Sequence, residues 1–314
     1  MDTSQLLDIT RSILGQPTAP FHEDAVRGEI CQQLAQCPHV TLEIDDFENL
    51  IALYQNGDDA RPRYAFAAHM DHPGYVGGEF MGGVPTAYLE RNPPTRDFGA
   101  FAMWDLPAFA LQHSRIYSRA CDDLIGCAAI VAMFHELERT GAKGACMGLF
   151  SRAEEVGLVG ATLLAQSDRI PRDVTIISLE TSSERGGAAR MGSGVVIRVG
   201  DRTAIFDDAA TATLTHLAAA HEIPHQRCLM SGGTCEGTAY QLYGYRTAAV
   251  CVALGNYHNC GPDTTIDSEF VSLADVEAMT RLCIAAASTT DEPDPHAVLR
   301  GKFEETVEKY RRLL

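Results

Sequence analysis

The chain has 314 residues, of which 46% are hydrophobic, and its formal net charge is −17. This length accommodates one large domain, or one domain that carries a small insertion. The acidity argues against binding to nucleic acid or to anionic membranes, because both partners require clustered Lys and Arg. The only lysines are Lys143, Lys302 and Lys309.

The cysteine pattern and the N-terminal residues indicate the cellular compartment of the protein. Ten cysteines are scattered singly, without a CxxC pair. Residues 1–16 lack the basic start and apolar middle of a signal peptide. No apolar run is long enough to cross a membrane as a helix. These features together predict a cytoplasmic protein in reducing surroundings, with no membrane partner.

The first 72 residues predict two helices and then three strands. Helices are expected over 5–14 and 22–35, and strands over 40–45, 50–54 and 63–68. The first two strands are short and close together, so we expect them to pair. The third shows little alternation of apolar and polar residues, as strands buried in parallel sheets do.

Residues 73–117 differ from the rest of the chain in composition. They are rich in Gly and Pro and contain the single tryptophan, Trp104. We expect a small β-rich insertion here, which would form a rim of the site or an oligomer contact. The predicted domains are therefore a catalytic domain of residues 1–72 and 118–314, and an insertion of residues 73–117.

Helix and strand patterns alternate from Asp122 onward. Helices are expected over 124–138, 158–166, 207–221, 236–243 and 272–288, and strands over 145–150, 174–179, 194–199, 225–230 and 247–254. Such alternation predicts right-handed βαβ crossovers and a mostly parallel central sheet. Residues 296–314 predict an exposed amphipathic helix.

Side chains that bind metals follow the predicted strands. His69, Glu180 and His258 each come at or just after a strand end, Glu154 and Glu155 follow another, and Asp122 precedes a helix. In open α/β sheets, ligands bind at the carboxyl ends of the strands. One His and one carboxylate for each metal, plus a shared carboxylate, suit two adjacent zinc-like ions.

The order of these groups predicts individual roles. We expect His69, Glu180 and Asp122 to hold one ion, and Asp122, Glu155 and His258 to hold the other. Asp122 would be the shared carboxylate, because it begins a helix at the edge of the sheet.

Two further residues have predicted catalytic roles. Glu154 is the candidate general base, since adjacent side chains diverge and it cannot bind the ion of Glu155 in the same way. Asp71 lies two residues after His69, on the same face of an extended chain. It would accept a hydrogen bond from the second imidazole nitrogen of that histidine.

A Gly-rich turn predicts the substrate-binding region. Gly232 and Gly233 would let a substrate backbone approach closely, and Cys235 and Glu236 follow that turn. Acidic groups beside the metals would seat a free α-amine of a substrate. A basic group would instead bind a substrate carboxylate, and Arg185 and Arg190 are available for that role.

Several segments resemble one known family in their order along the chain. They are AAHMDHPGYV (67–76), CDDLIGCAA (121–129), EEVGLVGA (154–161), ISLETS (177–182), VVIRVGDR (195–202), SGGTCEGTA (231–239) and YHN (257–259). This set is similar to the glutamyl or deblocking aminopeptidases, a family of dinuclear zinc exopeptidases that includes the self-assembling tetrahedral (TET) peptidases.

The resemblance implies a phosphorylase/hydrolase-like α/β/α peptidase domain with an inserted β-rich dimerisation domain. It implies two divalent ions per chain, with zinc expected and cobalt or manganese as alternatives. It also implies peptide substrates that lose their N-terminal residues, a homodimer or larger homo-oligomer, and a cis peptide bond after Asp122. The family roles agree with those expected above for the ligands, for Glu154 and for Asp71.

The chain departs from the family pattern in the insertion and near the substrate pocket. GGTCEG stands where the family usually has GGTDAG, so Cys235 replaces an Asp, and HNC stands where HSP is usual. The family's side-chain specificity is therefore not transferred. The insertion is short for the family, which favours a dimer over a closed shell.

Two other functions remain open. Carboxypeptidases and amidohydrolases of the same clan carry a large lid domain between the fourth and fifth ligands. Here predicted core elements account for most residues between Glu180 and His258, which favours an aminopeptidase. A non-catalytic scaffold on a peptidase fold is the other alternative, although all five ligands and the base are present.

Overall fold

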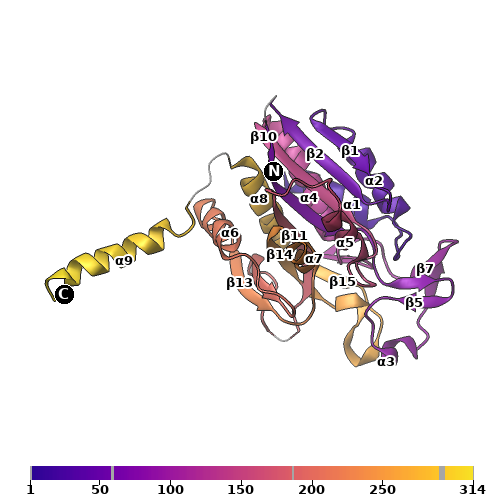
Figure 1. Ribbon diagram of the computed structural model, residues 1–314. Helices are drawn as coiled ribbons and strands as arrows, with labels where there is room; N and C mark the ends of the chain where they lie inside the picture. The colour runs from indigo at the N-terminus through magenta and orange to yellow at the C-terminus, as the bar shows by residue number, and fades with distance from the viewer. Residues whose placement is uncertain (1, 58–59, 186, 290–293, 314) are drawn as a thin grey trace.

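The structure, a computed structural model, describes residues 2–57, 60–185, 187–289 and 294–313. An eleven-stranded sheet carries helices on both faces (Figure 1). One face is covered by α1 (Thr3–Leu14), α2 (Asp24–Leu34), α4 (Leu124–Thr140), α6 (Asp208–Ala220) and α8 (Leu273–Ser288). The other face carries α5 (Val159–Gln166) and α7 (Glu236–Leu242). The predicted three-layer α/β/α class is confirmed.

The middle of the sheet is parallel. It consists, in spatial order, of β10 (Gly144–Ser151), β3 (Pro62–His69), β11 (Thr175–Ser183) and β14 (Arg246–Gly255). These strands are buried almost throughout because helices cover both faces. Most elements end close to their predicted bounds. The exception is β11, which continues past Glu180 to Ser183.

The flanks of the sheet are antiparallel. β1 (Val40–Ile44) pairs with β2 (Leu50–Asn56), as predicted, and β2 runs antiparallel to β10. On the other side, β14 contacts two strands: β12 (Val195–Asp201) along its middle and β15 (Glu269–Ser272) at its end. β12 is antiparallel to β14 because no helical crossover separates it from β11. β12 pairs in turn with β13 (His225–Met230), and this outer pair is parallel.

Residues 73–117 divide between two sheets. β4 (Gly74–Val76), β5 (Glu79–Met81), β6 (Thr95–Asp97) and β7 (Phe101–Trp104) form a separate four-stranded sheet, with the short helix α3 (Thr86–Leu89) beside it. Tyr75, Phe80 and Trp104 pack their rings together there. The hairpin of β8 (Ala110–Gln112) and β9 (Arg115–Ser118) instead joins the main sheet through β15.

The C-terminal residues form the exposed helix that the sequence predicts. α9 (Ala297–Tyr310) extends away from the body of the chain (Figure 1) and is followed by the 3₁₀ turn Arg311–Leu313; Leu314 lies outside the described residues. Among the described residues, no helix combines the length and the apolarity that crossing a membrane requires.

Candidate metal centre

The register of the parallel strands brings the predicted site residues to one edge of the sheet. Ser151, at the end of β10, lies opposite His69, at the end of β3. On the other side of β3, Ser178 lies opposite Ala67, and the same offset places Glu180 level with His69. β3 ends at His69, so Glu180 lies inside β11 but level with the last residue of β3.

Two groups of three side chains gather at this edge. One ligand atom from each of His69, Glu154 and Glu180 lies within 4.8 Å of the others, and the same holds for Asp122, Glu155 and His258. Five of these residues are the predicted ligands. The sixth, Glu154, is the predicted base, and its position in the first group would also suit a ligand.

Asp122 lies between the two histidines. Its Oδ1 is 3.6 Å from Nε2 of His69, and its Oδ2 is 3.5 Å from Nε2 of His258. Nε2 of His258 is also 3.2 Å from Oε2 of Glu155. One carboxylate therefore presents one oxygen to each group, which is the geometry of a bridging ligand. The peptide bond between Asp122 and Asp123 is cis, as the family resemblance implies.

Both imidazole rings are held through Nδ1. In His69 this atom lies 3.1 Å from the backbone oxygen of Asp71, and in His258 it lies 3.0 Å from the backbone oxygen of Gly83. A ring that donates from Nδ1 to a carbonyl keeps Nε2 as the acceptor available to a metal ion. The backbone carbonyl of Asp71 thus orients His69. The side-chain oxygen Oδ1 of Asp71 lies farther from Nδ1 of His69, at 3.4 Å.

The residues present suit two divalent ions. Asp122 Oδ1, Glu155 Oε1 and Glu180 Oε1 are buried and have no hydrogen-bond partner among the described residues. Buried carboxylate oxygens normally have partners, because desolvating an anion without compensation is costly. Imidazole nitrogen and carboxylate oxygen are also common donors to zinc and to similar ions. A metal ion at each group would satisfy these oxygens.

The electrostatics of the site also favour cations. Burial raises the pKa of Glu180 to about 8. Desolvation likewise raises the pKa of Glu154, and the nearby carboxylates of Glu180 and Glu155 raise it further. Burial opposes ionisation of Asp122 as well, but the nearby imidazole rings of His258 and His69 lower its pKa. A cluster of carboxylates this dense is destabilised by its own repulsion unless positive charge compensates it.

Two other buried carboxylates hold the backbone beside the ligands. The oxygens of Asp71 accept hydrogen bonds from the backbone nitrogens of Glu154 and Glu155, at 2.9 and 3.1 Å. Glu269 accepts from the backbone nitrogens of Cys121, Asp122 and His258 at 2.7, 3.1 and 2.8 Å. We did not identify Glu269 from sequence, since one Glu at the start of a strand gives no signal.

A cavity of about 480 Å³ opens over the first group. Its lining includes His69, Asp122, Glu154 and Glu180, and also Gly232, Gly233 and Cys235. Glu236 is not in this lining. It is fully buried at the start of α7, where it accepts a hydrogen bond from Ser151. Three of the four predicted substrate-binding residues therefore lie at the cavity, and Glu236 lies behind it.

Comparison with known proteins identifies the family. Residues 96–282 match the family model described as M42 glutamyl aminopeptidase, which is more than half of the chain. The chain belongs to the M42 glutamyl aminopeptidase family. Membership makes it a hydrolase of the peptidase class, in agreement with the resemblance found in the sequence.

Relatives of known structure share the fold of this M42 chain. The Pyrococcus horikoshii TET1 peptidase, which can assemble into a tetrahedron or a large octahedral shell, is 22% identical, with a TM-score of 0.71 over 90% of this chain and 99% of its own. The aminopeptidase APDkam598 from Desulfurococcus kamchatkensis is 19% identical, with a TM-score of 0.75 over 94% and 96%. A protein of Acetivibrio thermocellus named "Putative aminopeptidase" is 24% identical over 91% of this chain and 99% of its own length.

We expect the metal-free M42 chain to lose stability as the pH rises. Burial raises the pKa of Glu180 from 4.5 to about 8, and those of Glu236 and Glu269 from 4.5 to about 7. Between the ordinary pKa of 4.5 and the raised pKa of each group, the folded chain binds more protons than the unfolded chain. The stabilising contribution of each group is therefore full below pH 4.5 and is lost as the pH passes the raised pKa.

Thermal unfolding of the chelated protein at a series of pH values measures this effect. The unfolding midpoint should fall between pH 4.5 and about 8, and saturating zinc should remove much of the slope. The pKa of Asp122 is lowered, so its contribution to stability is lost as the pH falls. This loss occurs below its ordinary pKa of 3.8 and therefore outside this window. A midpoint that rises across the window would contradict the assignment of these buried acids.

Proposed function

We propose that the protein is a metal-dependent aminopeptidase that removes N-terminal residues from peptides, with two divalent ions bound by each chain. The single observation that carries this proposal is the position of Asp122, one oxygen of which faces each histidine. Family membership supports the peptidase reaction, and the two groups of ligands support the dinuclear site. Zinc is the expected ion, with cobalt or manganese as alternatives.

The proposed ligand set is the one expected from the sequence. His69, Glu180 and Asp122 would hold one ion, and Asp122, Glu155 and His258 the other. When bound, two such ions would lower the pKa of a water between them and polarise the carbonyl of the substrate.

The proton transfers are assigned to Glu154. Its carboxylate would accept a proton from the attacking water and deliver it to the nitrogen of the leaving amine. The raised pKa of Glu154 suits a group that must both take and release a proton near neutral pH. Asp71 supports this role by binding the backbone nitrogens of Glu154 and of Glu155.

The cavity supports the proposed binding mode. The carboxylates of Glu154 and Glu180 lie in its wall and would attract the free α-amine of a peptide. Gly232 and Gly233 have open space where a side chain would begin, so the peptide backbone could approach them closely. Cys235 lines the same wall, where it would contribute to the choice of side chain.

One observation favours the rival activity. Arg198 lines the cavity and is 3% exposed, and Arg185 lies at the same cavity. A buried guanidinium would bind a carboxylate, which could be an acidic side chain of the substrate. It could equally be the α-carboxylate that a carboxypeptidase or an N-acyl amino-acid amidohydrolase must recognise. This amidohydrolase activity is the second candidate.

A substrate panel distinguishes the two candidates. We expect hydrolysis of unblocked dipeptides and aminoacyl-nitroanilides, and little release of acetate from N-acetyl amino acids, because the acidic wall would seat a free amine. Efficient cleavage of N-acetyl amino acids, with free-amine substrates left intact, would replace the aminopeptidase with the amidohydrolase. Two bound ions without turnover of any amide would instead favour a non-catalytic scaffold.

We also propose that residues 73–117 form an insertion that mediates self-association, as a homodimer or a larger homo-oligomer. The separate four-stranded sheet of β4 to β7, with the aromatic cluster of Tyr75, Phe80 and Trp104, supports an insertion, although β8 and β9 pair with the main sheet. The main body would then be a catalytic domain of residues 1–72 and 118–314. All ten cysteines are free, which suits the reducing cytoplasm that we propose as the location.

Light scattering at micromolar concentration tests the assembly. We expect a dimer, because the insertion is short for the family, although the TET1 peptidase of Pyrococcus horikoshii can assemble into a tetrahedron or a large octahedral shell. A monomer would contradict self-association through residues 73–117. A closed shell would contradict the argument from the length of the insertion.

A further inference from the structure

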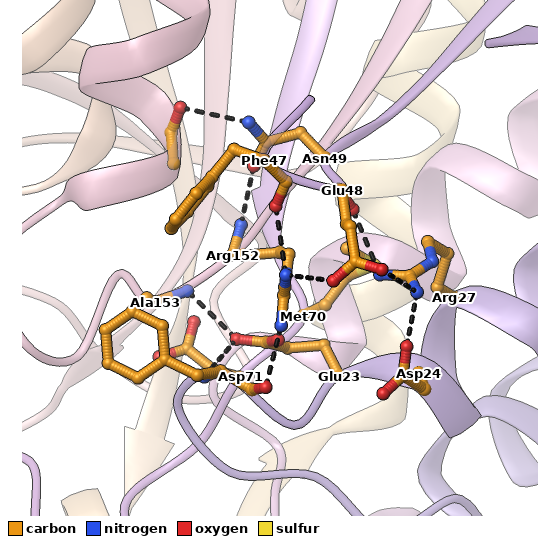
Figure 2. Close-up of polar contacts among 12 residues, drawn as sticks. Glu23, Asp24, Arg27, Phe47, Glu48, Asn49, Met70, Asp71, Arg152 and Ala153 are labelled. Atoms are coloured by element: carbon orange, nitrogen blue, oxygen red, sulfur yellow. Dashed lines mark hydrogen bonds and ion pairs between the residues drawn. The ribbon is translucent and has the colours of Figure 1, made fainter. Parts of the chain in front are cut away.

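The loop that carries Glu154 is held by a buried arginine directly before it. Nε of Arg152 donates to Glu23 at 2.5 Å, and its Nη1 donates to the backbone oxygen of Phe47 at 3.0 Å and to the carboxylate of Glu48. Its Nη2 donates to the backbone oxygen of Phe21 at 2.7 Å. Figure 2 shows the guanidinium between these groups, and the residue is 6% exposed. Arg152 thus ties the loop to two distant segments of the chain.

Glu23 contacts the same loop a second time. While one of its oxygens binds Arg152, the other accepts a hydrogen bond from the backbone nitrogen of Ala153 at 3.1 Å (Figure 2). The second oxygen also accepts from the backbone nitrogen of Phe21, at 2.8 Å. Glu23 is fully buried, and burial raises its pKa while Arg152 opposes that shift. Replacing Arg152 with an uncharged side chain would therefore leave an unpaired acid inside the protein.

The loop needs this support because its backbone is strained. Ala153 has a φ of 52°, in the left-handed region that residues with a Cβ disfavour. Such a conformation persists only where the surroundings impose it. Four consecutive backbone nitrogens are bound by side chains: that of Arg152 by Asn49, that of Ala153 by Glu23, and those of Glu154 and Glu155 by Asp71.

The network continues away from the site into α2. Glu48, which binds Arg152, is also a partner of Arg27, and Arg27 donates to the backbone oxygen of Glu48 at 3.1 Å (Figure 2). Arg27 in turn pairs with Asp24 in the first turn of α2. The N-terminal helical region and the loop after β10 are therefore joined by charged groups.

We propose that Arg152 and Glu23 are positioning residues, which fix the loop of residues 152–155 so that Glu154 and Glu155 face the metal centre. Neither of them lies among the six groups of that centre. The inference rests on the proposed function for its kinetic consequence. Its structural consequence, that the loop loosens when the pair is broken, can be measured without turnover.

The test compares Arg152→Met with Arg152→Lys, which keeps the charge but loses the planar fork. Hydrogen exchange of the amides of residues 153–155 should become about 10-fold faster or more in Arg152→Met, because their charged support is lost. Exchange in α8 should not change. The value of kcat should fall by about 100-fold, as expected for a small displacement of a catalytic group, while KM changes little. Arg152→Lys should give intermediate values for both readouts.

Arg139→Met is the matched control. Arg139 makes a similar two-contact pair with Glu136, but in the last turn of α4 and with 60% of its side chain exposed. This variant should keep wild-type exchange of residues 153–155 and wild-type kcat. Equal effects in the control would show that loss of any arginine loosens the fold.

Each outcome decides the inference. Unchanged exchange of residues 153–155 in folded Arg152→Met would overturn it, and so would faster exchange throughout the chain with kcat reduced only in proportion to the folded fraction. If Arg152→Met does not fold, Arg152→Lys decides by the same two readouts. A wild-type protein without turnover on any free-amine substrate would contradict the proposed function, and exchange of the loop would still decide the positioning role.

Discussion

Replacing Glu154 with Gln is expected to remove most turnover and to leave both metal ions bound. General base catalysis contributes about 100- to 10,000-fold to rate, so kcat should fall by about that factor. KM should rise moderately, because the α-amine of the substrate then faces the carboxylate of Glu180 without that of Glu154. Steady-state kinetics on an aminoacyl-nitroanilide, together with metal analysis of the purified variant, would check both parts.

Glu155→Gln is the matched comparison, since it makes the same chemical change one residue later. Glu155 lies 3.2 Å from Nε2 of His258, so this variant should bind one ion more weakly and regain activity when excess metal is added. Glu154 also lies in a group with His69 and Glu180. Loss of an ion from Glu154→Gln, without loss of one from Glu155→Gln, would therefore make Glu154 a ligand and exchange the two roles.

Replacing Asp122 with Asn is expected to remove both ions, because this residue faces both histidines. Wild-type protein should bind two divalent ions per chain and lose activity on chelation. Asparagine at this position would keep the shape of the side chain but lose its charge and one oxygen acceptor, so neither ion would keep its bridging ligand. Metal analysis after dialysis, and calorimetric titration of the chelated variant with zinc, would measure the change.

Asp207→Asn is a suitable control for this substitution. Asp207 also precedes a helix, α6, where its carboxylate accepts from the backbone nitrogen of Ala210 at 2.8 Å. Asn caps helices about as well as Asp, so this variant should keep both ions. Retention of one tightly bound ion by Asp122→Asn would show that the bridge is needed at only one of the two positions. A wild-type protein that binds a single ion, or stays active after exhaustive chelation, would refute the paired site.

The sequence was informative where one physical rule links it to space. Parallel strands bring their carboxyl ends to one edge, so the ends of apolar runs were enough to place His69, Glu155, Glu180 and His258 together. The helices were also predictable, because their apolar faces recur with a regular period. In contrast, the sheet branches at β14, because β12 and β15 both pair with the same edge of this strand. No local pattern encodes such a choice.

The residues that the sequence did not reveal act through the backbone of other residues. Glu269 binds the backbone nitrogens of Asp122 and His258, and Glu23 binds that of Ala153. An isolated Glu has the same local appearance whether it is solvated or buried against a loop. Asp71 was placed near His69 by its spacing, but its contacts with Glu154 and Glu155 involve the loop after β10, which is distant in sequence.

The wide separation of the site residues along the chain has a consequence for the order of folding. His69 and His258 belong to opposite parts of the sequence, and they meet only when β14 has added to β11 beside β3. Such distant contacts form late, because closing long loops is entropically unfavourable. A chain that is still folding therefore has no complete centre for hydrolysis. Completion of the sheet would therefore also complete the proposed metal centre.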